Sequence, residues 1–223
     1  MSLYFNVSIV NTIGTIDDLI EKNEAYLSKF QKYLVNKYTE LALGIERRIE
    51  LSKLIIRTGK PLKNNEWKSS KLIDLSTMPS ENIFINSFSN GIDFKTNIKT
   101  LNNLDLVYGS IRPYFKKAGF ALDVDYIAGS VFSFTTTNPN NYLWILACIS
   151  SDEFHKFTNS NSQGTKMPII NWETFVTYKV SYDEKKLDAF NSVMKPLFDL
   201  ATNKMKQLRK LNETKKILLS KYF

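Results

Sequence analysis

Residues 13–41 read IGTIDDLIEKNEAYLSKFQKYLVNKYTEL, and the spacing of their apolar side chains decides how the rest of the chain is interpreted. Apolar residues recur in a strict three–four alternation, and polar residues fill the two remaining seam positions. The apolar positions are Ile13, Ile16, Ile20, Leu27, Phe30, Leu34 and Leu41, and the polar ones are Asn23 and Lys37. This alternation predicts a long helix with a coiled-coil seam. An amphipathic helix packed on a globular core is the alternative interpretation.

The end of this helix is expected well beyond the seam. Helix-forming residues continue past Leu43, and we expect the helix to extend as far as Ile56. Gly59-Lys60-Pro61 then breaks it. Basic residues gather in this stretch, so a phosphate-facing surface and a merely solvated helix face are both considered. They are Arg47, Arg48, Lys53, Arg57, Lys60 and Lys63.

The same alternation returns after Tyr182 and predicts a second long helix. Its seam positions are Leu187, Phe190, Met194, Leu197, Ala201, Leu208, Leu211, Leu218 and Tyr222, with Lys204 and Lys215 at the remaining two. Pro196 is expected to kink this helix or to divide it into two pieces. The two helical segments also share residues at one fixed offset, which is typical of a two-period repeat. Leu27, Leu34, Lys37 and Tyr38 match Leu211, Leu218, Lys221 and Tyr222.

Between the two helices the helical period stops, and short β-prone runs separated by turn residues predict a compact mixed α/β domain. The expected strands are residues 83–85, 104–108, 126–128, 130–134 and 175–180, and the expected short helices are 142–149 and 152–157. The predicted class is therefore α+β, with one globular mixed α/β domain flanked by two long helices that form a coiled coil.

The amino-acid composition limits the classes of function that the chain could have. The 223 residues carry a formal net charge of +8, which favours a polyanionic partner without choosing among DNA, RNA and a membrane surface. The single cysteine, Cys148, lies in an apolar run and is expected to be buried, and the single histidine, His155, cannot build a multi-histidine metal site. The sequence offers neither an apolar run near the roughly 20 residues of a membrane span nor a signal peptide, so we expect a cytoplasmic protein without a membrane partner.

Two segments combine basic and aromatic or amide side chains in a way that suits nucleic acid. Residues 108–119 carry Arg112, Lys116 and Lys117 around two aromatic residues, and residues 161–172 carry Gln163, Thr165 and Lys166 around one glycine. Arginine and lysine suit phosphate oxygens and guanine, whereas glutamine pairs with adenine. These six residues are the candidate DNA contacts. For each of them a structural role, such as bracing a loop or closing a turn, is the alternative.

Several motifs together resemble a known family. They are YGSIRPY (108–114), SQGTKMP (162–168), INW (170–172), the closing ILLSKYF (217–223) and IGTIDDLIEKN (13–23). The chain resembles the specificity (S) subunit of a type I restriction-modification system, in a half-subunit-like form with one target recognition domain. On this resemblance we expect an N-terminal coiled-coil helix over 1–58, a target recognition domain over 59–182 and a C-terminal coiled-coil helix over 183–223.

The resemblance implies a DNA sequence-recognition subunit that is not itself an enzyme. Such a subunit reads a bipartite DNA site, one half per recognition domain, and an antiparallel coiled coil sets the gap between the halves. It docks the methyltransferase (M) subunit, which binds S-adenosylmethionine, and it assembles with the restriction (R) subunit. No cofactor or metal of its own is implied. Two copies of a half subunit are also predicted to pair as a homodimer through their helices.

Two other function classes were weighed. A coiled-coil protein-interaction adaptor without DNA specificity explains the helices equally well. A stand-alone nuclease or methyltransferase is disfavoured, because the sequence offers neither a metal-ligand cluster nor a glycine-rich cofactor loop. Residues 138–142, NPNNY, are similar to the Asn-Pro-Pro-Tyr motif of adenine methyltransferases, but they depart at the third residue and carry an extra residue, so they are interpreted as a turn.

Overall fold

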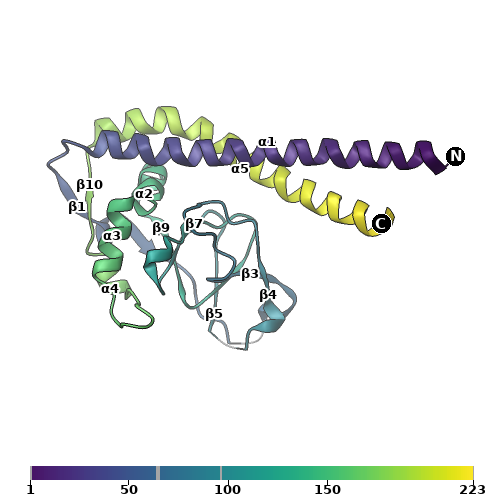
Figure 1. Cartoon of the computed structure of the whole chain (residues 1–223). Coiled ribbons are helices and arrows are strands. Elements are labelled where there is room, and N and C mark those ends of the chain that lie inside the picture. Colours follow the sequence, from purple (N-terminus) through teal and green to yellow (C-terminus); the bar gives the residue numbers. More distant parts are fainter. Residues whose placement is uncertain (1, 64–65, 96, 223) are drawn as a thin grey trace. The chain divides into compact units, whose positions relative to one another are not determined.

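The computed structural model describes residues 2–63, 66–95 and 97–222, with residues 2–10 as helix backbone alone. A long helix lies at each end of the chain, α1 (Ser2–Ala42) and α5 (Glu184–Tyr222), and mixed α/β structure lies between them in the sequence (Figure 1). The chain divides into two compact units, one of Met1–Tyr33 with Lys195–Phe223 and the other of Leu34–Met194. The predicted α+β class with two long flanking helices is confirmed.

In the first unit, α1 and α5 run antiparallel. The Lys215 ammonium lies 2.6 Å from a carboxylate oxygen of Asp17, and the rings of Phe30 and Phe198 lie 6.2 Å apart. Residue numbers therefore rise along one helix as they fall along the other. The predicted α1 seam is buried at Ile16, Asn23, Leu27 and Phe30. Burial of an asparagine among apolar neighbours restricts the register that the two helices can adopt.

The seam of α5 differs from the prediction at positions 197 and 204, and the predicted seam residue Tyr222 is exposed. Phe198 and Met205 are buried, whereas Leu197 and Lys204 are only partly buried. From Met194 to Phe198 and from Ala201 to Met205 the buried residues are four apart, where the prediction had a spacing of three. Burying Met205 instead of Lys204 avoids the desolvation of an ammonium group, which explains why the apolar neighbour takes the inner position. Pro196 lies inside α5, and the helix is not divided there.

The expected end of α1 was wrong. The helix ends at Ala42, not at Ile56. Gly44 has a φ of +74°, the left-handed conformation that ends many helices and that glycine adopts without strain. The Lys186 ammonium donates to the carbonyl oxygen of Leu41 at 2.9 Å, which satisfies part of the last turn. The residues after Gly44 form the short strands β1 and β2 instead of continuing the helix. The basic residues among them, such as Arg48 and Arg57, therefore belong to the second unit.

The described residues of the second unit form three sheets. A two-stranded sheet pairs β1 (Arg48–Glu50) with β10 (Lys179–Ser181). An antiparallel sheet has the order β2 (Ile55–Arg57), β9 (Val131–Thr136), β6 (Leu106–Gly109) and β7 (Ala118–Phe120). The third has the order β4 (Ser89–Asn90), β3 (Lys71–Ile73), β8 (Tyr126–Ala128) and β5 (Ile98–Thr100), and its β3–β8 pair is parallel.

The second unit also contains three complete α-helices and several 3-10 turns among its described residues. The α-helices are α2 (Tyr142–Ile149), α3 (Asp152–Ser160) and the short α4 (Trp172–Phe175). Single 3-10 turns are η1 (Leu51–Lys53), η2 (Glu66–Ser69), η3 (Gly91–Asp93), η4 (Pro113–Phe115) and η5 (Pro139–Asn141). The predicted helix over 142–149 is confirmed, and the one predicted over 152–157 continues to Ser160. The 138–142 motif forms the η5 turn that leads into α2, as predicted.

Of the predicted strands, three are found and two are not. Residues 104–108, 126–128 and 130–134 correspond to β6, β8 and β9. Residues 83–85 form only an isolated bridge, between Phe84 and Phe120. The strand predicted over 175–180 was wrong, because α4 occupies its start and β10 begins only at Lys179. The Asn171 side chain accepts from the Thr174 N–H at 2.7 Å, so a local helix cap overrides the β-prone composition.

The core of the second unit contains the single thiol. Trp144 on α2 is fully buried, and its ring lies 4.8 Å from Tyr38 and 5.2 Å from Phe190. Cys148 is buried on the same helix, and burial raises the pKa of its thiol to about 12. A thiol in that state is a packing residue, as expected from the sequence. Among the described residues, each helix is either too short or too polar to cross a bilayer.

Candidate nucleic-acid interface

The two basic segments picked out in the sequence lie side by side. The main-chain N–H of Arg112 donates to the carbonyl oxygen of Pro168 at 2.7 Å, and the N–H of Ile170 donates to the carbonyl oxygen of Ser110 at 3.0 Å. An antiparallel bridge between these hydrogen bonds completes the pairing. Segments that are far apart in the sequence are therefore fixed to each other through their backbones, which leaves their side chains available for other contacts.

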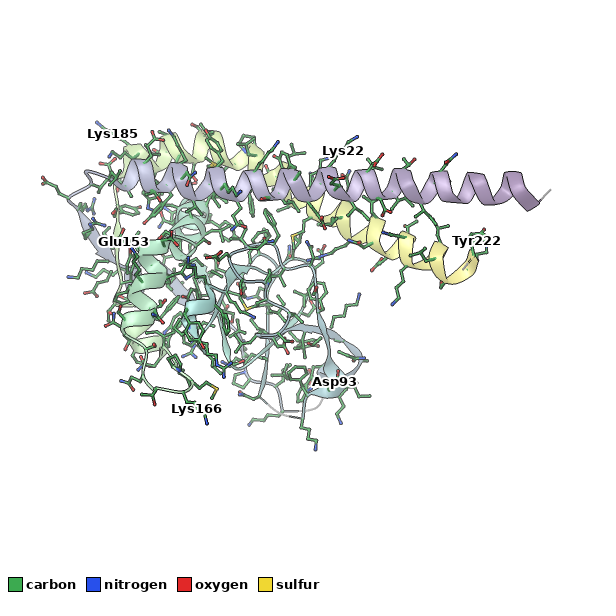
Figure 2. The ribbon with its side chains drawn as sticks, in the orientation of Figure 1. Lys22, Asp93, Glu153, Lys166, Lys185 and Tyr222 are labelled. Carbon is green, nitrogen blue, oxygen red and sulfur yellow. The ribbon has the colours of Figure 1, made fainter. Side chains whose placement is uncertain are left out.

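The 163–169 loop is a tight hairpin with an exposed tip. Gln163 and Ile169 exchange main-chain hydrogen bonds of 2.9 and 2.8 Å, which close the loop. Gly164 has a φ of +102°, and a Cβ at this position would lie 3.2 Å from the Met167 carbonyl oxygen. Gly164 is thus required by both conformation and space. Figure 2 shows Lys166 at the outward end of this loop, where it is exposed.

The 112–116 loop is shaped by two residues in the left-handed region. Arg112 and Lys116 have φ values of +51° and +52° and flank the η4 turn. This conformation is uncommon for residues other than glycine, so it requires support from the surrounding structure. The turn carries Tyr114 and Phe115, which are 47% and 42% exposed and whose rings lie 4.7 Å apart. Two exposed aromatic rings next to an exposed arginine form a surface suited to stacking on a nucleic acid.

Two of the six candidate residues have protein partners. The Lys116 ammonium lies 2.7 Å from a carboxylate oxygen of Glu81 and 2.8 Å from one of Asp152. The hydrogen bonds to Asp152 and Glu81 raise the pKa of Lys116, and the pKa of Asp152 is lowered by the same bond. The Lys117 ammonium donates to the carbonyl oxygen of Leu75. DNA would have to compete for both lysines, whereas the other four candidates are exposed.

A buried polar network joins β6 to α3, the two elements that precede the loops in the sequence. The Thr158 hydroxyl donates to the carbonyl oxygen of His155 at 3.0 Å, so its oxygen accepts from the Tyr108 hydroxyl at 2.7 Å. The Tyr108 oxygen, 3.1 Å from Nδ1 of His155, then accepts from that ring nitrogen. Burial, together with the charge of Lys116, lowers the pKa of His155 to about 4. The histidine is therefore neutral near pH 7 and structural.

The structure adds to this region one contact that the sequence does not indicate, that of Arg57 with Trp172 and Phe132. The guanidinium of Arg57 lies 5.0 Å from the ring centre of Trp172 and 5.8 Å from that of Phe132. Trp172 follows the 163–169 loop directly, so an exposed cation on β2 adjoins the interface. The sequence placed Arg57 on a helix, and only the stacking on Trp172 identifies it. Arg57 and the INW motif at 170–172 lie far apart in the sequence, so this contact could not be found without the fold.

A shallow hollow of about 310 Å³ lies between α3 and the 112–116 loop. It is lined by Tyr114, Lys116, Asp152, His155, Lys156 and Asn159. In the described part of the chain, no three or more His, Cys, Asp or Glu side chains are placed to hold a metal ion. Two of the lining side chains, Asp152 and Lys116, are paired with each other. The arrangement offers hydrogen-bond donors and aromatic surfaces for binding.

Solved structures share this fold. The chain has the fold of an S subunit of a type I restriction-modification system. The S subunit from M. genitalium superposes with a TM-score of 0.60 and 14% sequence identity, over 97% of this chain and 60% of that one. This chain therefore spans about three fifths of the length of that solved S subunit.

Two further solved chains are more distant. The HsdS subunit from Thermoanaerobacter tengcongensis gives a TM-score of 0.49 with 9% identity, over 96% of this chain and 56% of that one. A chain from a structure of type I restriction-modification complex assembly gives 0.43 with 13% identity, over 96% and 57%. No protein-family model and no curated protein matches the sequence.

Proposed function

We propose that this chain is a DNA sequence-recognition subunit of a type I restriction-modification complex and that its second unit reads one half of a bipartite site. The observation that carries the proposal is the main-chain pairing of the Arg112 loop with the Gln163–Ile169 hairpin, which presents exposed donors on one joined surface. The net charge of +8 supports a polyanionic partner. The fold shared with S subunits supports the same assignment.

The residues of this surface differ in the contacts that they suit. Gln163 presents an amide that pairs with the adenine edge, and Arg112 presents a fork that suits guanine or a phosphate. Thr165 and Lys166, at the exposed hairpin tip, suit phosphate oxygens. Lys116 and Lys117 are already bound to Glu81, Asp152 and the Leu75 carbonyl, so in this proposal they hold the loop that presents Arg112.

The partners of the proposed function are the M and R subunits. The M subunit would supply S-adenosylmethionine and the methyl transfer, and this chain would supply no cofactor. The two long helices would act as the coiled-coil spacer and docking element, and two copies of the chain would pair through them to read both halves of a site. Chromosomal DNA as the target implies a cytoplasmic location.

Sequence selection tests this proposal. The full chain, alone and with its M subunit, would be mixed with a random duplex library, and bound duplexes would be sequenced after several rounds. We expect enrichment of a defined half-site and affinity that falls steeply with salt, because each neutralised phosphate releases counterions. Equal retention of all sequences at every salt concentration, with the M subunit present, would contradict the proposal.

A coiled-coil adaptor without DNA specificity is the second candidate. Exposed apolar side chains on the long helices favour it, since such residues often mark protein contacts. They are Leu19, Tyr33, Leu200 and Ile217, which are 45%, 44%, 43% and 64% exposed. Purification of the chain with a partner other than a methyltransferase, together with the absence of any shift of duplex DNA, would support the adaptor.

A further inference from the structure

Arg57 and Lys99 lie next to each other although they belong to different sheets. The segment after β2 runs alongside β5, since the Thr100 N–H donates to the carbonyl oxygen of Lys60 at 3.0 Å. A Cβ on Gly59 would lie only 3.4 Å from the Cβ of Lys99. The stem of Lys99 therefore packs against the backbone two residues beyond Arg57, and the absence of a side chain at Gly59 makes this approach possible.

Among the described residues, the two cations, Arg57 and Lys99, form no ion pair with a carboxylate. Lys99 is half-buried, and burial together with the nearby charge of Arg57 lowers the pKa of its ammonium. Two like charges that are held together without a carboxylate are unfavourable in the free protein. An anion bound between them would relieve this repulsion.

Arg57 is oriented in a way that leaves its hydrogen-bond donors available. Its guanidinium carbon lies 5.0 Å from the ring centre of Trp172 and 5.8 Å from that of Phe132, and in the described part of the chain the group donates no side-chain hydrogen bond. The N–H groups lie around the edge of the guanidinium, where they match the paired oxygens of a phosphate. The aromatic contacts thus restrict the position of the group and do not consume its donors.

We propose that Arg57 and Lys99 form a binding site for a backbone phosphate of duplex DNA, adjoining the two joined loops at Trp172. This inference rests on the proposed function and extends the DNA surface from the loops onto β2 and β5. Phosphate contacts of this kind position a protein on the duplex and carry no sequence information. The site should therefore contribute affinity to every duplex equally, in contrast to Gln163.

Salt titration of DNA binding by the full chain and its Lys99→Gln variant tests the site. We expect weaker binding to both a selected and an unrelated duplex by the same factor, with the slope of log affinity against log salt reduced by about 1. Arg57→Gln should behave alike, and Arg57→Lys should recover part of the affinity. Lys185→Gln is the matched control, because it removes the same charge from an exposed position at the start of α5, and its slope should stay that of the parent (Figure 2).

A stability measurement separates this site from a structural role. Because Lys99 is half-buried beside a like charge, Lys99→Gln should melt at the same temperature as the parent or higher, although it binds DNA less well. A lower melting temperature with unchanged salt slope would overturn the proposal and make Lys99 a structural residue. A thermal-shift assay of the parent and Lys99→Gln with inorganic phosphate is a further experiment. Saturable stabilisation that Lys99→Gln abolishes, beyond that of chloride at equal ionic strength, together with an unchanged salt slope of duplex binding, would assign the site to free phosphate and overturn the DNA assignment.

Failure of this inference differs from failure of the proposed function. If the parent chain selects a half-site but the Arg57 and Lys99 variants keep its affinity and salt slope, the phosphate site is wrong and the function stands. If the parent binds all duplexes equally and these variants still lower the slope, the phosphate site stands and sequence recognition is wrong.

Discussion

The 112–116 loop with the adjoining Lys117 and the 163–169 loop carry similar basic side chains, but the protein contacts of these side chains differ. In the first loop, Lys116 is held by Glu81 and Asp152 and Lys117 by a main-chain oxygen. In the second loop, backbone hydrogen bonds alone close the hairpin, and Lys166 at its tip is exposed. Basic composition therefore does not measure how many cations are available to a ligand. The lysines of the first loop are held by protein groups, whereas the lysine of the second loop is available to a ligand.

The largest expected effect concerns His155, the buried histidine that joins α3 to β6. Its pKa is about 4 in the folded chain against about 6.5 when unfolded, so the unfolded state binds the proton more readily between these values. Stability should be complete above about pH 6.5 and fall by up to about 1.4 kcal/mol per pH unit as the pH falls toward 4. Urea unfolding at several pH values measures this. His155→Gln should lack this part of the pH dependence, and equal curves for both proteins would contradict the assignment.

Removal of one hydroxyl from the same network should have the next largest effect. Tyr108→Phe leaves Nδ1–H of the buried His155 without its acceptor and removes the donor to Thr158. We expect a loss of about 1–3 kcal/mol in unfolding free energy. The matched control is Tyr114→Phe, whose ring is 47% exposed and whose change should stay within about 0.5 kcal/mol. Equal effects of the two substitutions would show that the network does not hold the loops.

A glycine substitution tests the second loop by itself. Gly164→Ala introduces a Cβ at a φ of +102° and 3.2 Å from the Met167 carbonyl oxygen, so we expect a loss of about 1 kcal/mol. Hydrogen exchange at the Ile169 N–H should become faster, and duplex affinity should fall. Gly14→Ala on α1 is the control, because a Cβ there meets nothing within 4 Å and should stabilise the helix. Unchanged exchange at Ile169 would indicate that the hairpin tolerates the side chain.

The smallest expected effects come from replacing one lysine in each loop, Lys166 and Lys116, and they should distinguish the available lysine from the paired one. Lys166→Gln should lower duplex affinity and the salt slope without changing the unfolding free energy. Lys116→Gln should lower the unfolding free energy by less than about 1 kcal/mol, because its ion pairs are partly exposed, and should change the salt slope less than Lys166→Gln does. Denaturation and anisotropy titrations of both variants measure the contrast. An identical loss of salt slope in the two would remove the distinction between the loops.

The long helices were predictable because their signal is local and repeated. The three–four spacing identified the buried α1 seam, including Asn23, from the sequence alone. The end of α1 was missed because one glycine, Gly44, stops a pattern that propensity would continue. The α5 seam was misassigned where Leu197 and Phe198 are adjacent, since either fits the alternation and only packing decides between them.

The site was predictable in its parts but not in its assembly. Both basic segments were found from composition, and SQGTKMP was correctly placed in a loop. The hydrogen bond from Arg112 to Pro168 depends on tertiary structure, as do the ion pairs of Lys116 with Glu81 and Asp152. Arg57 was weighed only as one of a basic cluster that could face phosphate, and Lys99 was not a candidate, because the two strands that bring them together, β2 and β5, were not predicted. Availability of a charge is a property of the fold, and a sequence shows only its presence.

The burial of Cys148 has a practical consequence for chemical labelling. It is the only cysteine in the chain, and in the folded state it is buried, with a thiol pKa of about 12. A maleimide dye should therefore leave the native protein unmodified at neutral pH, because the thiolate is the reactive form. Thr165→Cys would place one reactive thiol at the hairpin tip in an otherwise silent background. A fluorophore at that position would report on loop motion and DNA proximity without any need for a cysteine-free parent.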